Sequence, residues 1–214
     1  MTTSLTLAEQ IADTLLEIKA VNLSPAAPFT WASGLKSPIY CDNRLIMSYP
    51  KARHTVENAL AQVIRDQFAE ADVIAGTATA GIPHAAIVAH ILDKPMIYVR
   101  SSAKAHGKQN AIEGQIQPGQ KVVMIEDLIS TGGSVIQAAD LVKEAGGDVI
   151  GCLAIFSYQL AKGKSAFAVQ PYPLVTLTDY TTLIERAVQQ PDLKDYRETL
   201  ENWYQDPAAW SASH

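Results

Sequence analysis

The chain has 214 residues, of which 48% are hydrophobic and 18% charged, and its formal net charge is −5 at pH 7. This composition is typical of one α/β domain with enough apolar mass for a core, and it argues against a general nucleic-acid binder, which needs a basic surface. Cys41 and Cys152 lie in apolar surroundings without a C-x-x-C spacing, so we expect buried free thiols. No apolar run reaches the roughly 18 residues of a spanning helix and no secretory start is present, so we expect a cytoplasmic protein without a membrane partner.

The N-terminal part of the chain predicts two amphipathic helices. The first begins with the capping-box pattern of Thr6 and Glu9 and keeps apolar residues at helical spacing as far as Ile18. The second runs from Pro50 to Phe68, again with apolar residues on one face. We expect both apolar faces to pack into the core.

A hairpin is expected between these two helices. Two short β-prone runs, 29–32 and 38–41, flank a turn at 33–36, which predicts that the runs pair with each other. The alternative to a functional role is that the aromatic residues of this region are core side chains and that charged residues such as Lys36 are solvated.

From residue 72 onward, strand patterns alternate with helical ones. The expected strands are 72–76, 96–99, 121–126, 149–156 and 174–177, and further helices are expected at 159–169, 180–188 and 193–204. This alternation predicts a mostly parallel five-stranded sheet flanked by helices, in a single domain of residues 1–214.

Two turns of small residues follow the first and third of these strands. They are TATAGIP at 77–83 and STGGS at 130–134, and each one opens a predicted helix. Backbone N–H groups and the positive end of a helix dipole suit phosphate, and ligands of open α/β sheets bind at the carboxyl ends of strands. Both turns are therefore candidate phosphate sites.

Two carboxylates, Glu126 and Asp127, stand where the third strand is expected to end. They suit sugar hydroxyls or a phosphate-bound Mg²⁺ rather than the phosphate itself. The stretch matches neither G-x-x-x-x-G-K-[ST] nor G-x-G-x-x-G. The alternative is an ordinary strand–turn–helix connection with an incidental acid pair.

The segment from Arg100 to Gly114 has no secondary-structure period and also contains Lys104, His106 and Lys108. A long loop of this kind in a compact domain is usually functional or disordered. By themselves its charges suit a solvated loop, but beside a phosphate site in an acidic protein they predict a cationic lid.

The acid pair with the turn at 130–134 resembles the phosphoribosyl-pyrophosphate (PRPP) motif of the type I phosphoribosyltransferases. The run FTWASGLKSPIYCDNR at 29–44 resembles the N-terminal signature of the orotate phosphoribosyltransferases. The resemblance covers nearly the whole chain. It implies the type I phosphoribosyltransferase fold, in which residues 1–48 contribute a hood over the base and residues 100–114 form a mobile catalytic loop.

The resemblance also implies an activity and its residues. The reaction is Mg²⁺-dependent transfer of ribose 5-phosphate from PRPP to orotate, giving orotidine 5′-monophosphate and diphosphate in pyrimidine biosynthesis, by a homodimer whose loops reach the partner's site. The implied catalytic residues are Arg100, Lys104, His106 and Asp127. The first three also contact PRPP, together with Thr79, Ala80, Glu126, Asp127, Leu128, Ile129, Ser130, Thr131, Gly132, Gly133 and Ser134. Orotate would contact Phe29, Lys36, Tyr40 and Ser130, and PRPP itself would supply most of the Mg²⁺ ligands, with no certain protein ligand.

The chain departs from the family pattern in three respects. Ser101 and Ser102 stand where relatives commonly carry a further lysine, Ala80 stands where other branches carry one, and 158–159 offers no arginine for the base carboxylate. Two alternatives remain. A phosphoribosyltransferase for another base is disfavoured by the hairpin, and a PRPP-sensing regulator would need a nucleic-acid-binding surface for which the sequence gives no basic stripe.

Overall fold

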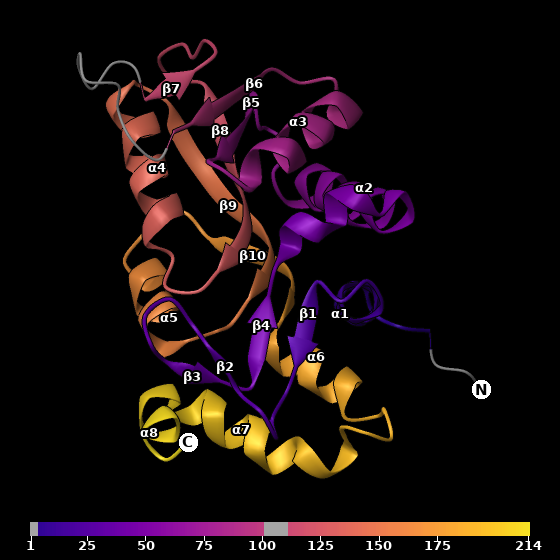
Figure 1. Cartoon of the computed structure of the whole chain (residues 1–214). Helices are drawn as coiled ribbons and strands as arrows, with labels where there is room; N and C mark the ends of the chain where they lie inside the picture. Colours follow the sequence, from indigo (N-terminus) through magenta and orange to yellow (C-terminus); the bar gives the residue numbers. More distant parts are fainter. Residues whose placement is uncertain (1–3, 101–110) are drawn as a thin grey trace. The chain divides into compact units, whose positions relative to one another are not determined.

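The computed structural model describes residues 4–100 and 111–214 of the chain. Internal contacts divide the chain into two compact units. Figure 1 labels the helices and strands of the chain. We call Arg53–Leu177 the sheet unit, and the residues up to Ala52 together with Thr178–His214 the terminal unit. That residues 1–48 contribute a hood to a single domain stays a prediction.

A six-stranded sheet in the order β10-β9-β8-β5-β6-β7 forms the centre of the sheet unit (Figure 1). β5 pairs in parallel with β6 and β8, β8 pairs in parallel with β9, and β7 pairs antiparallel with β6. The five predicted strands are confirmed, and the sheet has a sixth, the short edge strand β7, which the prediction of a five-stranded sheet did not include. The strands are β5 Val73–Thr77, β6 Met96–Val99, β7 Ile112–Glu113, β8 Lys121–Ile129, β9 Asp148–Ser157 and β10 Leu174–Asp179.

The strand order places β5 and β8 at a topological switch point. From β5 the chain continues to β6 on one side, and after β7 it crosses to β8 on the other side of β5. In open α/β sheets, the crevice at the carboxyl ends of such a strand pair is where ligands bind. We therefore expect a ligand-binding site at the carboxyl ends of β5 and β8.

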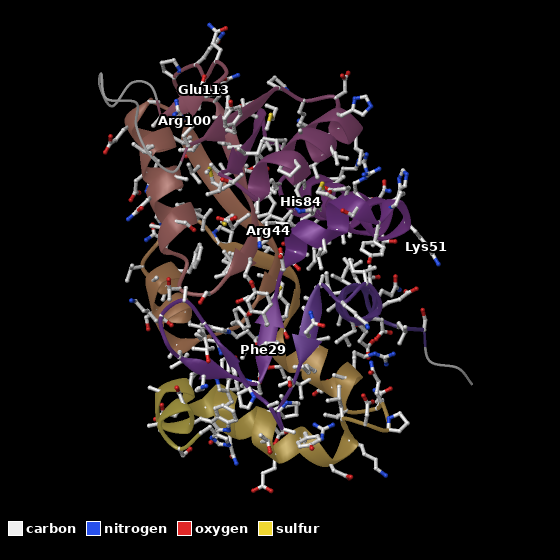
Figure 2. The ribbon with its side chains drawn as sticks, viewed as in Figure 1. Phe29, Arg44, Lys51, His84, Arg100 and Glu113 are labelled. Carbon is white, nitrogen blue, oxygen red and sulfur yellow. The ribbon has the colours of Figure 1, made fainter. Side chains whose placement is uncertain are left out.

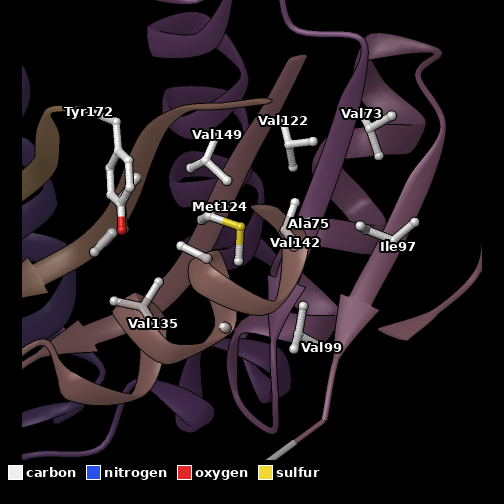
Figure 3. Close-up of a cluster of buried hydrophobic side chains, with 14 of the residues drawn as sticks. Val73, Ala75, Ile97, Val99, Val122, Met124, Val135, Val142, Val149 and Tyr172 are labelled. Atoms are coloured by element: carbon white, nitrogen blue, oxygen red, sulfur yellow. The ribbon is translucent and has the colours of Figure 1, made fainter. Parts of the chain in front are cut away.

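Helices pack on both faces of this sheet. Valines of α4 (Gly133–Glu144) contact a buried cluster formed by β5, β6, β8 and β9, to which Val73, Val122 and Met124 contribute (Figure 3). Gly76 points to the opposite face by strand alternation, and there α3 (Gly81–Leu92) approaches it closely. Two other helices, α2 (Pro50–Gln67) and α5 (Ala161–Ala168), confirm predicted helical segments.

β8 is longer than predicted, and this changes where the acid pair lies. The strand continues to Ile129 because β9 runs beside it as far as Ser157 and supplies the pairing partners. The expectation that the strand ends at the acid pair is therefore wrong: Glu126 and Asp127 both lie within β8.

The terminal unit combines the first helix with the C-terminal helices. The predicted capping box of α1 (Leu7–Glu17) is confirmed, because Thr6 Oγ1 accepts the Glu9 N–H and Glu9 Oε2 accepts the Thr6 N–H. The expected helix at 193–204 is a short 3₁₀ turn followed by α7, and α8 was missed. The C-terminal elements are α6 Tyr180–Ala187, η3 Lys194–Tyr196, α7 Arg197–Gln205 and α8 Pro207–Ala212.

The predicted hairpin is present but shorter, and one of its strands pairs elsewhere. β2 (Phe29–Thr30) pairs with β3 (Lys36–Ser37), whereas β4 (Ile39–Cys41) pairs antiparallel with β1 (Val21–Leu23). Pro38 has no N–H to continue the first ladder, so the chain changes partner there. The expected pairing of 38–41 with 29–32 is therefore wrong.

The C-terminal helices fix this hairpin within the terminal unit. The Lys36 N–H donates to Ser211 Oγ of α8 at 2.8 Å, and Trp203 Nε1 of α7 donates to the Lys36 carbonyl at 3.3 Å. Trp31 packs edge-on against Trp203 with the ring centroids 5.8 Å apart. The last helices thus determine the backbone position of a residue predicted to bind the base.

Both cysteines are buried thiols outside any disulfide, as the sequence predicted. Burial raises the pKa of the Cys152 thiol, so the uncharged form is favoured. Within residues 4–100 and 111–214, none of the helices combines the length and apolar character needed to cross a membrane.

Candidate active site

Two loops leave the carboxyl ends of β5 and β8 at the switch point. The β5 loop, residues 78–80, leads into α3, and the β8 loop, residues 130–132, leads into α4. In the described part of the chain, no side chain caps the first turn of either helix. The first N–H groups of these two helices, which follow neighbouring strands, are thus oriented toward the same sheet edge, an arrangement that suits two anionic groups.

Gly81 brings the β5 loop against β8. A side chain at this position would collide with the Ile125 carbonyl oxygen, and its Cβ would lie 3.4 Å from the Glu126 Cα. A Cβ at Gly76 would lie 2.9 Å from the Ile82 Cα. Both glycines are therefore needed for α3 to begin directly over β8, beside the acid pair.

The β8 loop is supported from behind by α5. Gly132 has φ +78°, and a Cβ there would lie 2.7 Å from the Phe167 ring. A Cβ at Gly163 would lie 2.8 Å from the Ser130 carbonyl oxygen. Gly133 is exposed, and the nearest atom to a Cβ built there would be the Thr131 hydroxyl oxygen at 4.0 Å. The side of the loop that faces α5 is therefore packed, and the side at Gly133 is open to a ligand.

The two carboxyl groups of the acid pair have different environments. Glu126 is 5% exposed; its Oε1 accepts the Asp127 N–H at 3.1 Å, and its Oε2 accepts the Ser134 hydroxyl at 3.4 Å. Burial, and to a smaller extent the charge of the adjacent Asp127, raises the pKa of Glu126 to about 9. Glu126 thus connects β8 to the start of α4 as a neutral group, whereas Asp127 is only partly buried.

The remaining predicted PRPP residues of the sheet unit fall on these same elements. Thr79 and Thr131 are exposed in their loops, Ala80 and Ser130 are half-buried, and Leu128 and Ile129 belong to β8. Arg100 lies at the start of the predicted lid, and its Nη1 is 3.4 Å from Glu113 Oε1 (Figure 2). Lys104 and His106 lie outside the described residues.

The predicted orotate residues other than Ser130 belong to the terminal unit. The rings of Phe29 and Tyr40 lie 5.8 Å apart at their centroids and are tilted by 43°. Tyr40 is 42% exposed, and Lys36 is half-buried, with its backbone bonded to α7 and α8.

Two residues that support the site were missed by the sequence reasoning. Gly163 and Phe167 back the β8 loop, yet they lie on a helix more than thirty residues further along the chain. A glycine in the middle of a short helix is the signal that could have been used, since it costs helix stability and often marks a close contact.

No cluster of three or more potential metal-binding side chains (His, Cys, Asp or Glu) occurs among the residues that the structure describes. A divalent ion at this edge of the sheet would therefore need ligands from a bound substrate in addition to the acid pair.

Comparison with known proteins gives the family. Residues 46–195 match the model of the phosphoribosyl transferase domain family. An orotate phosphoribosyltransferase of Listeria monocytogenes serotype 4b is 57% identical over 203 residues, which cover 94% of this chain and 97% of that protein. The chain belongs to the orotate phosphoribosyltransferase family. The family resemblance inferred from the sequence is thereby confirmed.

Other members of the family agree with this assignment. The orotate phosphoribosyltransferase of Halalkalibacterium halodurans is 53% identical over 204 residues, with 95% of this chain and 97% of that protein covered. The crystal structure of the orotate phosphoribosyltransferase from Aeropyrum pernix superposes with a TM-score of 0.74 at 27% identity, covering 84% of this chain and 99% of that one. Leishmania donovani UMP synthase gives a TM-score of 0.77 at 26% identity, over 92% of this chain and 42% of that one. The type I phosphoribosyltransferase fold predicted from the sequence is confirmed.

Replacing Glu126 tests its buried, neutral state. The folded protein retains the Glu126 proton up to about pH 9, whereas the unfolded chain loses it near the ordinary value of 4.5. Stability from this group is therefore fully present below about pH 4.5 and is lost as the pH rises toward 9. Glu126→Gln cannot lose a proton, so its melting temperature should fall less than that of the wild type between about pH 5 and pH 9.

Glu144→Gln, on the exposed side of α4, is the matched control and should keep the wild-type pH dependence. Thermal melts followed by circular dichroism measure both. An unchanged pH dependence in Glu126→Gln would mean that Glu126 is ionised in the folded protein.

Proposed function

We propose that this chain transfers the ribose 5-phosphate group from PRPP to orotate, giving orotidine 5′-monophosphate and diphosphate, a step of pyrimidine biosynthesis. The observation that carries the proposal is the pair of loops at the ends of β5 and β8, in a chain of the orotate phosphoribosyltransferase family. PRPP has a phosphate group at each end of its ribose, and the two loops offer a separate site for each.

The 5′-phosphate is assigned to the β8 loop. Its N–H groups from Ser130 to Ser134 and the exposed hydroxyl of Thr131 provide hydrogen-bond donors, and the dipole of α4 favours a negative charge there. The diphosphate is assigned to the β5 loop, where Thr79 and Ala80 precede α3. Because Gly81 lies against β8, the diphosphate end and the acid pair come close enough to bind one molecule.

Asp127 is assigned to the ribose, where positive charge develops as the bond to diphosphate breaks. A carboxylate aimed at such a charge contributes about 3–4 kcal/mol to transition-state stabilisation. Glu126 has a different task in this proposal, because its buried carboxyl accepts the Ser134 hydroxyl and positions the start of α4.

The leaving diphosphate needs positive charge, which a chain of net charge −5 must supply locally. Arg100 begins the proposed lid, and Lys104 and His106, outside the described residues, would complete it. Closing the lid excludes water and strengthens every charge interaction inside. We propose a homodimer in which each lid covers the partner's site.

Orotate is a planar, anionic base, and the proposed contacts match both properties. The faces of Phe29 and Tyr40 suit a planar ring, and the Lys36 ammonium suits its carboxylate. Ser130 adds a hydroxyl from the β8 loop.

Mg²⁺ is proposed as the cofactor, and the side chains present fit it. Mg²⁺ usually binds one or two carboxylates together with substrate phosphates and water. The partly buried carboxylate of Asp127 would supply one ligand, with PRPP supplying the others. Bound there, the ion would neutralise charge on the diphosphate.

The activity is tested with purified protein, PRPP and Mg²⁺, offering orotate, uracil, hypoxanthine and adenine in parallel. Orotate alone should be consumed, with stoichiometric release of diphosphate, and a chelator should stop the reaction. Consumption of uracil or a purine instead of orotate would contradict the proposed substrate. PRPP binding without turnover of any base would favour the regulator.

Mixed dimers test the shared sites. Lys104→Ala and Asp127→Asn should each lower turnover by about 10²-fold or more, the scale of one aimed charge. If each lid serves the partner's site, a mixed dimer has one site with both defects and one with neither. Statistical exchange makes half of the dimers mixed, so mixing the two variants should restore up to about a quarter of wild-type activity.

The control mixes two differently tagged preparations of Asp127→Asn, which should stay inactive. Subunit exchange is confirmed from the tags. If the two different variants exchange subunits and remain inactive, each lid acts on its own subunit.

A further inference from the structure

Glu57 of α2 and His84 of α3 form a buried polar pair in the sheet unit. Glu57 Oε1 lies 2.6 Å from His84 Nδ1, and the two side chains are 1% and 0% exposed. Among the described residues, Glu57 Oε2 and His84 Nε2 have no hydrogen-bond partner. A buried pair with half of its polar atoms unsatisfied stabilises a fold less than apolar side chains of the same size would. Stability of the fold therefore does not explain why Glu57 and His84 are buried together.

The position of His84 suggests what the pair does. His84 lies three residues after Gly81, in the first turn of α3, and its ring reaches Glu57 of α2. The β5 loop immediately precedes this turn. Any movement of the first turn of α3 therefore moves the N–H groups of Thr79 and Ala80.

The start of α3 is located by contacts on more than one side. Gly81 lies against the Ile125 carbonyl, and Gly76 lies against Ile82, so these two contacts set the distance of α3 from the sheet. Neither contact is a directional bond, because each is only a close approach of backbone atoms. The Glu57–His84 hydrogen bond is directional and joins α3 to α2.

The electrostatic surroundings favour a strong hydrogen bond. Burial raises the pKa of Glu57, while the hydrogen bond with His84 and the positive charge of Arg53 act in the opposite direction. In such a poorly solvated place, a hydrogen bond is stronger than in water, and breaking it is correspondingly costly.

We propose that Glu57 and His84 are positioning residues that hold the first turn of α3, so that the backbone N–H groups of the β5 loop stay directed at the diphosphate of PRPP. Neither residue touches the substrate. The inference rests on the proposed function, because it takes PRPP as the ligand of this loop. It implies that losing the pair weakens binding of PRPP and diphosphate but not of orotate, whose proposed contacts lie on other elements.

The test compares variants of His84 by titration calorimetry with diphosphate and by the KM values for PRPP and orotate. His84→Leu should weaken diphosphate binding and raise the KM for PRPP by about tenfold or more, the effect expected of a displaced binding group. Its KM for orotate should stay unchanged. His84→Asn retains an N–H donor near the position of Nδ1 and should restore most of the PRPP affinity.

His90 provides the matched control, because it is an exposed histidine in the last turn of the same helix. His90→Leu should leave both KM values at the wild-type level. All comparisons are made at temperatures where circular dichroism shows each variant to be folded.

The double variant Glu57→Leu/His84→Leu separates positioning from stability. It removes both polar groups, so it should be at least as stable as either single leucine variant. It should nevertheless keep the weakened binding of diphosphate and PRPP, because the directional link is gone. If the double variant or a folded His84→Leu binds diphosphate and PRPP as tightly as the wild type does, this inference is wrong, whereas the proposed function is unaffected. A wild-type protein that binds no PRPP would overturn the proposed function and with it this inference.

Discussion

The contact of Gly81 with the Ile125 carbonyl is the constraint on which the proposed site depends. Since residue 81 has no side chain, α3 can begin directly over β8, and the loop after β5 comes to lie beside the acid pair. The strand order supplies the other half of the arrangement, because it makes β5 and β8 neighbours that feed helices from the same sheet edge. A ligand with charged groups at both ends can then bind two uncapped helix starts at once.

Buried carboxyl groups support both of these loops. Glu126 binds the hydroxyl at the start of α4, and Glu57 binds the histidine at the start of α3. Each of them is removed from water, and burial raises the pKa of each. A buried carboxyl group reduces the stability of the fold because it loses its contacts with water. Its hydrogen bond, however, fixes the orientation of the helix start, which apolar contacts do not. At functional sites, a loss of local stability commonly accompanies a fixed orientation of the binding groups.

The sequence predicted what depends on local pattern, and it failed where distant partners decide. Apolar periodicity located the strands of the sheet, and the hydroxyl- and glycine-rich turns marked both loops. The end of β8 could not be read from β8 alone, because β9 supplies its last pairing partners. Pro38 could have suggested the change of partner in the hairpin, but nothing local identified β1 as the new one. The Glu57–His84 pair joins residues 27 positions apart and leaves no periodic signal.

Amide hydrogen exchange, measured with and without PRPP and Mg²⁺, tests most directly whether both loops bind one substrate. The account predicts that PRPP slows exchange at the backbone N–H groups of residues 79–81 and 131–134 together, with smaller changes in the edge strands. Diphosphate alone should protect the first segment more than the second. Protection of only one loop by intact PRPP, or of neither, would contradict the account.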